Sequence, residues 1–260
     1  MTTIRAEDPD GFRGVRLLTL DRPPANAITA ALLADLSAAL DAAREDDAVR
    51  AVVLTGAGPF FSAGLDLRGG IDFAAAPGAG VASDPFAALR ECILRFLHLP
   101  KPTVAMLRGH AIAGGLVLVL ACDYRLGQEG EYRIGLNEVA IGASFPRAAF
   151  EVVRLRLTHQ RAGELLLGAT LYPAGEAVRL GVVDELLPAA TFEETLMRRA
   201  ARLGSYPRAA YAHTKAALVA ATIARVEAET PQEAAQTAAV WMTPESVAAR
   251  AEQARKLSGG

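Results

Sequence analysis

The sequence predicts an α/β fold with buried sheets and a helical C-terminal region, and three observations lead to this prediction. Short runs rich in branched apolar residues alternate with segments of helical periodicity. A strand followed by a tight turn and an Ala-Gly pair occurs twice, first from residue 52 and again from residue 103. From about residue 147 the pattern is mostly helical. The repeated unit is consistent with two turns of one superhelical arrangement.

The first half of the chain contains two predicted strands around a helix. Residues 15–20 and 49–54 are short and rich in Val and Leu, which is typical of buried strands. Residues 29–45 place leucines at helical spacing, and Thr29 is the expected N-cap of that helix. Residues 68–85 are dominated by Gly, Ala and single charges, so we expect a mobile loop there.

The second half contains fewer strands and more helix. Residues 103–107 predict a third strand, which leads through small residues into an apolar helix from about Gly114. Residues 182–187 predict a late strand. Residues 191–257 are Ala-rich and predict helices interrupted at three prolines: Pro207, Pro231 and Pro244.

Composition limits the class of protein. The chain has 260 residues, of which 52% are apolar and 22% charged, and its mean hydropathy is +0.22, so it can bury a sizeable core. Lys and Arg total 27 against 29 Asp and Glu, without a basic stripe, so no nucleic-acid partner is expected. The N-terminus lacks a signal peptide, and the longest apolar run, 111–122, is too short to cross a bilayer. We therefore expect a soluble, cytoplasmic protein that does not associate with membranes.

Several familiar kinds of site are absent from the sequence. The glycine cluster at 56–61 has Phe61 where a dinucleotide fingerprint has its third glycine, and Pro59 removes an amide that a phosphate would need. Ser62 lies in no nucleophile-elbow motif. The spacing of the 2 cysteines and 4 histidines matches no zinc motif, so no metal is expected.

Two small-residue motifs are better candidates for a site. Residues 61–67 follow a strand and residues 109–115 precede an apolar helix. Small side chains let backbones approach closely, and the second motif also provides the free amides of a helix N-terminus. Two such amides that converge on one point would form an oxyanion hole. On composition alone, two ordinary tight turns remain the simpler interpretation.

A set of ordered motifs resembles the crotonase, or enoyl-CoA hydratase/isomerase, superfamily. The motifs are Pro23-Pro24-Ala25-Asn26-Ala27, Phe61-Ser62-Ala63-Gly64-Leu65-Asp66-Leu67, Gly109-His110-Ala111-Ile112-Ala113-Gly114-Gly115, Cys122-Asp123-Tyr124-Arg125, Ile134-Gly135-Leu136-Asn137-Glu138-Val139, Ala174-Gly175-Glu176-Ala177 and Leu180-Gly181-Val182-Val183-Asp184. The resemblance implies a crotonase-type spiral of ββα turns with a helical C-terminal region. It also implies a spiral core domain with the active site over residues 1–200 and a helical trimerisation region over 201–260. A homotrimer or a dimer of trimers is therefore expected, with apolar tail residues Trp241, Met242 and Val247 available for contacts.

The resemblance assigns roles position by position. The two oxyanion amides belong to Leu65 and Gly114. The groove for the nucleotide and pantetheine of coenzyme A is lined by Ala25 and by the segment at 62–67, that is by Ser62, Ala63, Gly64, Asp66 and Leu67. Asp66 is expected to fix its loop rather than to act catalytically. Coenzyme A enters only as part of an acyl-CoA substrate, and no other cofactor is expected.

The reaction-specific positions depart from the hydratases of this superfamily. Those enzymes place two glutamates over the acyl chain; here the first position is Val117 and only the second, Glu138, is a carboxylate. Hydration uses both glutamates, whereas isomerisation needs only one base, which can carry a proton from the α-carbon to the γ-carbon. An apolar surrounding would raise the pKa of Glu138 toward a useful value.

We therefore expect an enzyme, most similar in motif to 3,2-trans-enoyl-CoA isomerases, with Glu138 as base. One alternative is a hydratase that uses a single glutamate, or a hydrolase or lyase of the same superfamily. Another is a non-catalytic acyl-CoA-binding scaffold, which the missing carboxylate favours and Glu138 opposes. The length and branching of the acyl chain are not encoded in any motif.

Overall fold

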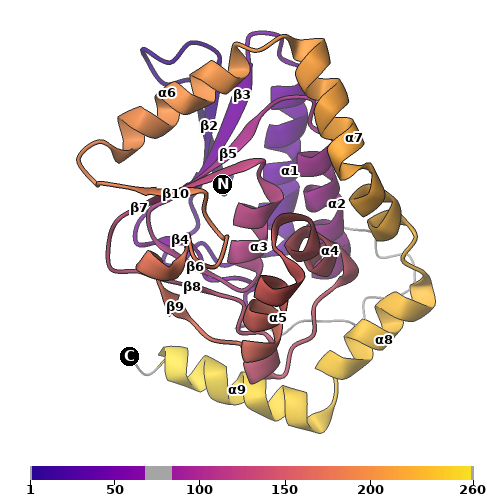
Figure 1. Cartoon of the computed structure of the whole chain (residues 1–260). Helices are drawn as coiled ribbons and strands as arrows, with labels where there is room; N and C mark the ends of the chain where they lie inside the picture. Colours follow the sequence, from indigo (N-terminus) through magenta and orange to yellow (C-terminus); the bar gives the residue numbers. More distant parts are fainter. Residues whose placement is uncertain (1, 68–83, 259–260) are drawn as a thin grey trace.

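The computed structural model describes residues 2–67 and 84–258, and it contains two sheets that share a spiral path (Figure 1). The larger sheet has the order β1-β2-β3-β5-β7-β10 and the smaller one β4-β6-β8-β9. The strands of the larger sheet are β1 (Ile4–Glu7), β2 (Val15–Leu20), β3 (Ala51–Gly56), β5 (Thr103–Leu107), β7 (Tyr124–Gln128) and β10 (Glu185–Leu187). Those of the smaller sheet are β4 (Phe60–Ser62), β6 (His110–Ile112), β8 (Arg133–Gly135) and β9 (Tyr172–Pro173).

The strand order confirms the predicted spiral. The chain passes from β3 to β4, then from β5 to β6, then from β7 to β8, so each turn adds one strand to each sheet. Equivalent strands pair in parallel, with Val53 opposite Val104 and Met106 opposite Leu126. Only the outer strands β1 and β9 pair antiparallel with their neighbours among the described strands. The repeat that the sequence shows twice therefore occurs a third time, at β7 and β8.

Helices cover both faces of the larger sheet. The helices of the described chain are α1 (Ala30–Glu45), α2 (Pro85–His98), α3 (Gly114–Ala121), α4 (Arg147–Arg156), α5 (His159–Gly168), α6 (Phe192–Gly204), α7 (Arg208–Glu227), α8 (Pro231–Trp241) and α9 (Pro244–Ser258), with short 3₁₀ helices at Val139–Ile141 and Ala174–Glu176. Helix α6 crosses one face, where Phe192 and Leu196 pack on Val53 and Met106. Helices α1 to α4 lie on the other face, which carries the larger apolar core.

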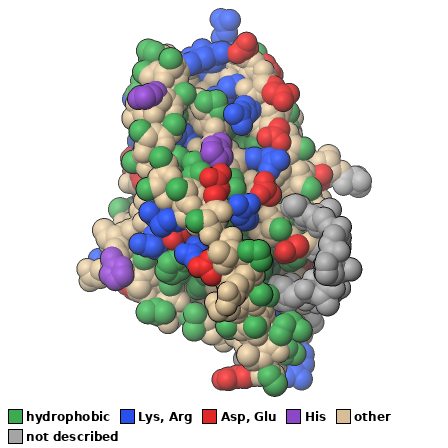
Figure 2. Space-filling view, turned by 90° about the vertical axis from the view of Figure 1, so that its right-hand side faces the viewer, with side chains coloured by type: hydrophobic (Ala, Val, Ile, Leu, Met, Phe, Trp, Pro, Cys, Tyr) green, Lys and Arg blue, Asp and Glu red, His purple; other side chains and the backbone are tan. Residues whose placement is uncertain are grey.

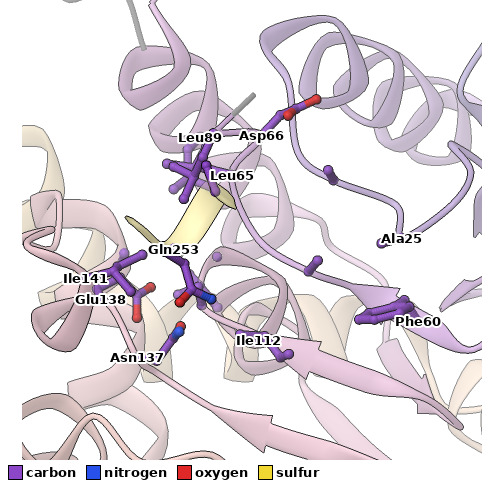
Figure 3. Close-up of a pocket in the computed structure, with 18 of the residues that line it drawn as sticks. Ala25, Phe60, Leu65, Asp66, Leu89, Ile112, Asn137, Glu138, Ile141 and Gln253 are labelled. Carbon is purple, nitrogen blue, oxygen red and sulfur yellow. The ribbon is translucent and has the colours of Figure 1, made fainter. Parts of the chain in front are cut away.

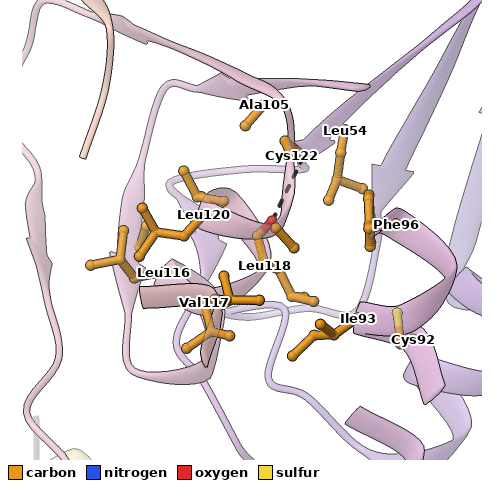
Figure 4. Packing of buried hydrophobic residues seen from close by; sticks show 14 of the residues in the cluster. Leu54, Cys92, Ile93, Phe96, Ala105, Leu116, Val117, Leu118, Leu120 and Cys122 are labelled. Carbon is orange, nitrogen blue, oxygen red and sulfur yellow. Dashed lines mark hydrogen bonds between the residues drawn. The ribbon is translucent and has the colours of Figure 1, made fainter. Parts of the chain in front are cut away.

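Helix α3 is buried along its whole length, because every residue from Gly114 to Ala121 is buried. Figure 4 shows its leucines and Val117 packed between the sheet residues Leu54 and Ala105 and the α2 residues Ile93 and Phe96. A helix that is apolar all round is stable only in such an interior. The helix therefore holds its N-terminus, at Gly114, in a fixed place inside the molecule.

Most predicted elements agree with the structure to within two or three residues. Thr29 caps α1 by accepting a hydrogen bond from the Leu32 amide, and the breaks between the C-terminal helices lie at the three prolines as expected: Pro207 directly precedes α7, and Pro231 and Pro244 begin α8 and α9. The strand predicted at 49–54 begins later, at Ala51, and the late strand is confined to β10. The loop expected at 68–85 falls outside the described residues except for Asp84 and Pro85, which begin α2. Helix α2 is an element that the sequence pattern did not predict.

The C-terminal helices attach to the spiral in two steps. Helix α7 packs on α2 and α4, where the buried ammonium of Lys215 lies 2.7 Å from Asp123. Helices α8 and α9 then follow α7 along the lower edge of the molecule in Figure 1, where α9 contacts the 3₁₀ helix Val139–Ile141. The boundary expected between residues 200 and 201 falls within α6.

The surface carries mixed charge. On the face in Figure 2, acidic and basic side chains alternate and neither sign forms a separate field. Within the described ranges, no helix is both long enough and apolar enough to span a membrane.

Candidate active site

A cavity of about 670 Å³ lies where the spiral loops meet the C-terminal helices. Its described lining comes from several parts of the chain: the segment before α1, strand β4 and the loop after it, Leu89 of α2, the end of β6 with the start of α3, the stretch from Asn137 into α4, Leu171, and helices α8 and α9. In Figure 3, Ala25 and Phe60 lie on one side of the cavity and Glu138 and Ile141 on the other, with Leu65 between them. This order gives the cavity two distinct ends.

Asn26 holds the loops at the first end together. Its side-chain amide donates to the carbonyls of Ala57 (2.9 Å) and Phe60 (2.8 Å), and its own carbonyl accepts from the Ser62 hydroxyl at 2.8 Å. Asn26 adopts a φ of +49°, a conformation that asparagine tolerates better than most residues, and it is 1% exposed. Asn26 belongs to one of the motifs quoted above but was assigned no role there, although an Asn beside a tight turn is a signal for such a connection.

Glycines bring the loop after β4 against the start of α3. Gly64 has a φ of +85°, and a Cβ there would lie 2.8 Å from the Cβ of Ala113. A Cβ on Gly115 would lie 2.3 Å from the Ser62 carbonyl oxygen, so only glycine fits at either position. Ala113 itself has a φ of +53°, which is strained for a residue with a side chain and occurs directly before the helix.

The amides of Leu65 and Gly114 lie close together beside the cavity as a result. A Cβ built on Gly114 would lie 3.9 Å from the Leu65 nitrogen, and standard covalent geometry puts it about 2.5 Å from the Gly114 nitrogen. Outside Gly114, its chain neighbours and its own helix, the nearest heavy atom to that Cβ position is Cδ1 of Ile28, at 3.3 Å. In the described part of the chain, neither amide donates to a backbone carbonyl. Two backbone donors beside an open cavity can stabilise an oxygen that gains negative charge.

Glu138 is the buried carboxylate of the second end. It is 7% exposed, and its Oε2 has no hydrogen-bond partner among the described residues. Burial raises the pKa of Glu138 to about 8, and a hydrogen bond from its own backbone amide offsets only part of this effect. Its carbonyl accepts from the amides of Ile141 (3.0 Å) and Ala143 (2.8 Å), which fix the backbone at this position. A carboxyl with such a pKa can take up and release a proton near neutral pH.

The cavity wall around Glu138 is largely apolar. Val117 of α3 is fully buried and lines the cavity, as do Leu89 of α2 and Ile141. Two neutral amides interrupt this wall: Asn137 and, from α9, Gln253. In Figure 3 the Gln253 side chain extends toward the part of the wall that Asn137 and Glu138 form.

The other carboxylate of the described lining, Asp66, is paired. It lies 2.6 Å from the guanidinium of Arg22, which also donates to the Ala27 carbonyl at 3.1 Å. The Asp66 amide donates to the Ile28 carbonyl at 2.9 Å. These contacts tie the loop after β4 to the segment before α1, which is a structural role.

The structure brings most of the predicted site residues to one cavity. Those that line it are Ala25, Ala63, Leu65, Asp66, Leu67, Gly114, Val117 and Glu138. Ser62 and Gly64 lie behind the lining; the Ser62 hydroxyl is fully buried and accepts from the Gly64 amide at 3.2 Å. Both therefore shape the loop from behind rather than face the cavity.

The C-terminal helices contribute residues to the cavity that no sequence motif indicated. Trp241 and Gln253 line the same cavity as Glu138, although more than 100 residues separate them in the sequence. Trp241 was expected on an apolar contact surface between subunits, but it is 2% exposed and packs within its own chain. Met242 and Val247 are exposed, as that expectation requires. No local pattern marks a tryptophan as returning to a distant loop.

The described residues contain no group of three or more His, Cys, Asp or Glu side chains that could hold a metal ion. Both cysteines are buried, and burial raises the pKa of each thiol to about 12, so they behave as small core residues. The chemistry available at the cavity is therefore that of one buried carboxyl, two backbone amides and an apolar wall.

Comparisons with known proteins agree with this arrangement. The family model described as enoyl-CoA hydratase/isomerase matches residues 11–252. Human mitochondrial enoyl-CoA delta isomerase 1 is 32% identical over 221 residues, which cover 84% of this chain and 72% of the relative. A putative enoyl-CoA hydratase of Thermus thermophilus is 40% identical over 164 residues, which cover 63% of each chain. The crystal structure of human mitochondrial delta3-delta2-enoyl-CoA isomerase has a TM-score of 0.89 at 26% identity, over 99% of both chains.

Proposed function

The chain belongs to the enoyl-CoA hydratase/isomerase family, and from this premise we propose that it isomerises 3-enoyl-CoA to 2-trans-enoyl-CoA. The observation that carries the proposal is the single available carboxylate. Glu138 is buried in the cavity with one oxygen unpartnered in the described structure, the wall position at 117 is valine, and Asp66 is paired with Arg22. A reaction that needs one base fits this arrangement better than one that needs two.

In the proposed reaction, Glu138 removes a proton from the α-carbon of the thioester. The C–H electrons form a dienolate, whose oxygen accepts hydrogen bonds from the amides of Leu65 and Gly114. The protonated Glu138 returns the proton to the γ-carbon, which moves the double bond from position 3 to position 2. A positioned base contributes roughly 10²–10⁴-fold, and each oxyanion donor contributes about 2.7–4 kcal/mol of transition-state stabilisation.

The apolar wall supports this assignment. A base works best when its pKa lies near the working pH, and burial raises the pKa of Glu138 to about 8. Val117 and Leu89 are apolar, and the other titratable side chains of the described lining, Arg22 and Asp66, pair with each other. The proton that Glu138 takes up is therefore kept for return to the same substrate.

A hydratase that uses one glutamate is the second candidate, and one observation favours it. The amides of Asn137 and Gln253 lie on the wall with Glu138, and such groups can hold a water molecule. Hydrolase, lyase and scaffold roles have no comparable support from the lining. We further propose that the protein acts in the cytoplasm as a trimer or a dimer of trimers, using exposed apolar residues such as Met242 and Val247.

Ultraviolet absorbance of the thioester tests the proposal directly. Isomerisation of a 3-enoyl-CoA creates a conjugated thioester and increases its absorbance, whereas hydration of crotonyl-CoA removes the conjugation. We expect the purified protein to increase the absorbance of 3-hexenoyl-CoA and to leave crotonyl-CoA almost unchanged. Rapid loss of crotonyl-CoA absorbance without isomerisation would favour the hydratase, and no change with either substrate would favour a scaffold.

A further inference from the structure

One residue of the C-terminal helices, Trp241, lines the cavity together with the segment that follows Glu138. That segment contributes Ile141, Ser144, Pro146 and Ala149 to the described lining, and the Trp241 indole is hydrogen-bonded to the Ser144 carbonyl. The proposed function places the thioester at Leu65 and Gly114 and the coenzyme on the side of Ala25, so the acyl chain extends toward Trp241. Trp241 offers the largest side chain of this group, and it is the last residue of α8.

Trp241 is held from three directions. Its indole Nε1 donates to the Ser144 carbonyl at 2.9 Å, and its ring meets the ring of Phe86 edge-on, with centroids 5.1 Å apart. The Arg250 guanidinium lies over its face, 4.9 Å from the centroid. These contacts come from the loop before α4, from α2 and from α9, so the indole is a fixed part of the wall.

The anchoring extends to the helices around it. The Ser144 hydroxyl donates to the Thr237 carbonyl of α8 at 3.1 Å, and Arg250 donates to the Gly142 carbonyl at 2.9 Å. Arg147 at the start of α4 lies 2.5 Å from Glu233 of α8. Helices α8 and α9 are thus bound to the 142–147 segment at several points. The indole cannot move aside unless these contacts break.

The residue that α4 contributes to the lining is small. Ala149 is 2% exposed and lines the cavity, so a larger side chain at this position would take up part of the cavity. A cavity that is lined by small residues and ends on a large, fixed aromatic ring has a definite depth.

We propose that Trp241 determines the longest acyl chain that this protein accepts, by closing the acyl end of the cavity. The inference rests on the proposed function only in taking an acyl-CoA thioester as the ligand. The protein then takes short- and medium-chain thioesters whose terminal methyl group ends at the indole. Longer chains lose affinity because their extra carbons find no apolar surface to contact.

Binding of saturated acyl-CoA thioesters tests the limit without any reaction, because they carry no double bond to move. Isothermal titration calorimetry with an even-numbered series from butanoyl- to hexadecanoyl-CoA measures affinity against chain length. Each buried methylene contributes about 0.8 kcal/mol, so affinity should rise about fourfold per methylene until the chain reaches Trp241. Beyond that length it should stop rising or fall.

Three variants test whether Trp241 causes this break, meaning the chain length at which affinity stops rising. Trp241→Ala should move it to longer chains, and Ala149→Leu should move it to shorter ones. Trp241→Phe keeps most of the bulk but removes the Nε1–H donor, so it should leave the break in place. Val240→Ala changes an exposed neighbour on α8 and is the matched control, with the parent's profile expected.

The outcomes separate the inference from the proposed function. Failure of the parent to bind any acyl-CoA would overturn the proposed function. Binding that strengthens through hexadecanoyl-CoA, or a break that stays in place in folded Trp241→Ala, would overturn the role of Trp241. If circular dichroism shows that Trp241→Ala does not fold, an unshifted break in Ala149→Leu overturns it instead.

Discussion

Two buried carboxylates of this molecule, Glu138 in the cavity and Asp123 at the junction of the spiral with α7, have opposite surroundings. Glu138 lies against apolar side chains, and its Oε2 has no partner in the described structure. The Asp123 carboxylate is contacted by four side chains: Thr103, Arg156, Tyr211 and Lys215. The side chain of Asp123 is 9% exposed, so the two groups are buried to a similar extent.

The difference shows how the same chemical group serves structure in one place and chemistry in another. A buried charge is tolerated when it is paired and hydrogen-bonded, and the donors around Asp123 meet that condition. They connect β5, α4 and α7, so the charge joins three elements. At Glu138 a hydrogen bond from its own backbone amide stabilises the anion only in part, so burial raises its pKa to about 8. The free-energy cost of a buried, unpaired carboxylate therefore occurs at the position where the proposed reaction moves a proton.

The largest expected effect comes from removing the titratable group of the cavity. Glu138→Gln keeps nearly the same size but cannot accept a proton, so isomerase activity should fall roughly 10²–10⁴-fold. Calorimetric affinity for a saturated acyl-CoA should change little, because the amide leaves the cavity lining intact. Glu131→Gln, an exposed change of the same kind in the segment before β8, is the control and should keep full activity. Activity of Glu138→Gln within about tenfold of the parent would remove Glu138 as the base.

At the junction the expected effect is on stability instead. Lys215→Met leaves part of the Asp123 charge uncompensated, and loss of one partner of a buried pair costs roughly 3–5 kcal/mol. The free energy of unfolding from urea titration measures this change. Neither Asp123 nor Lys215 lines the cavity, so the folded variant should keep the parent's turnover.

A double variant controls for the shape of the methionine. Adding Asp123→Asn to Lys215→Met removes the charge that the single variant exposes, so the pair should be more stable than Lys215→Met alone. If the losses in unfolding free energy caused by the two substitutions instead add independently, the ion pair is not the contact that holds α7 to the spiral.

Local patterns predicted the spiral well but not every element. The strands, the cap at Thr29 and the buried helix α3 follow from apolar periodicity that their own residues carry. Helix α2 also has local signals, since Asp84 caps it and Pro85 occupies its first turn, but they follow a Gly- and Ala-rich stretch that predicted a loop. The short strands of the smaller sheet depend on pairing with neighbouring turns of the spiral, which no local pattern expresses.

The site was predictable where a motif supplied it and not where tertiary contacts did. Glu138, Leu65 and Gly114 belong to motifs and were assigned by resemblance, and the structure brings them to one cavity. Trp241 and Gln253 reach that cavity only because α8 and α9 turn back on the 142–147 segment. The contacts that cause this turn are between side chains and backbone groups about 100 residues apart, so the sequence gives no sign of them.

The smallest expected effect is on the pH dependence of stability, and it tests the contrast between Glu138 and Asp123. In the unfolded chain the Glu138 carboxyl titrates near its ordinary pKa of 4.5, and in the folded protein burial raises its pKa to about 8. Below the lower value both states hold the proton, so Glu138 does not make stability depend on pH. Above it the unfolded chain loses the proton first, and the parent loses about 1.4 kcal/mol of stability per pH unit until its own carboxyl ionises near pH 8.

Glu138→Gln has no such proton, so its stability relative to the parent should rise between about pH 5 and about pH 8. The advantage reaches roughly 3 kcal/mol at pH 7 and then levels off as the folded carboxyl ionises. Urea unfolding of both proteins across this range measures the difference, and Glu131→Gln should follow the parent throughout. If the difference in unfolding free energy between Glu138→Gln and the parent stays constant with pH, the Glu138 carboxyl has its ordinary pKa in the folded protein. The free-energy cost of the buried charge would then not explain why Glu138 differs from Asp123.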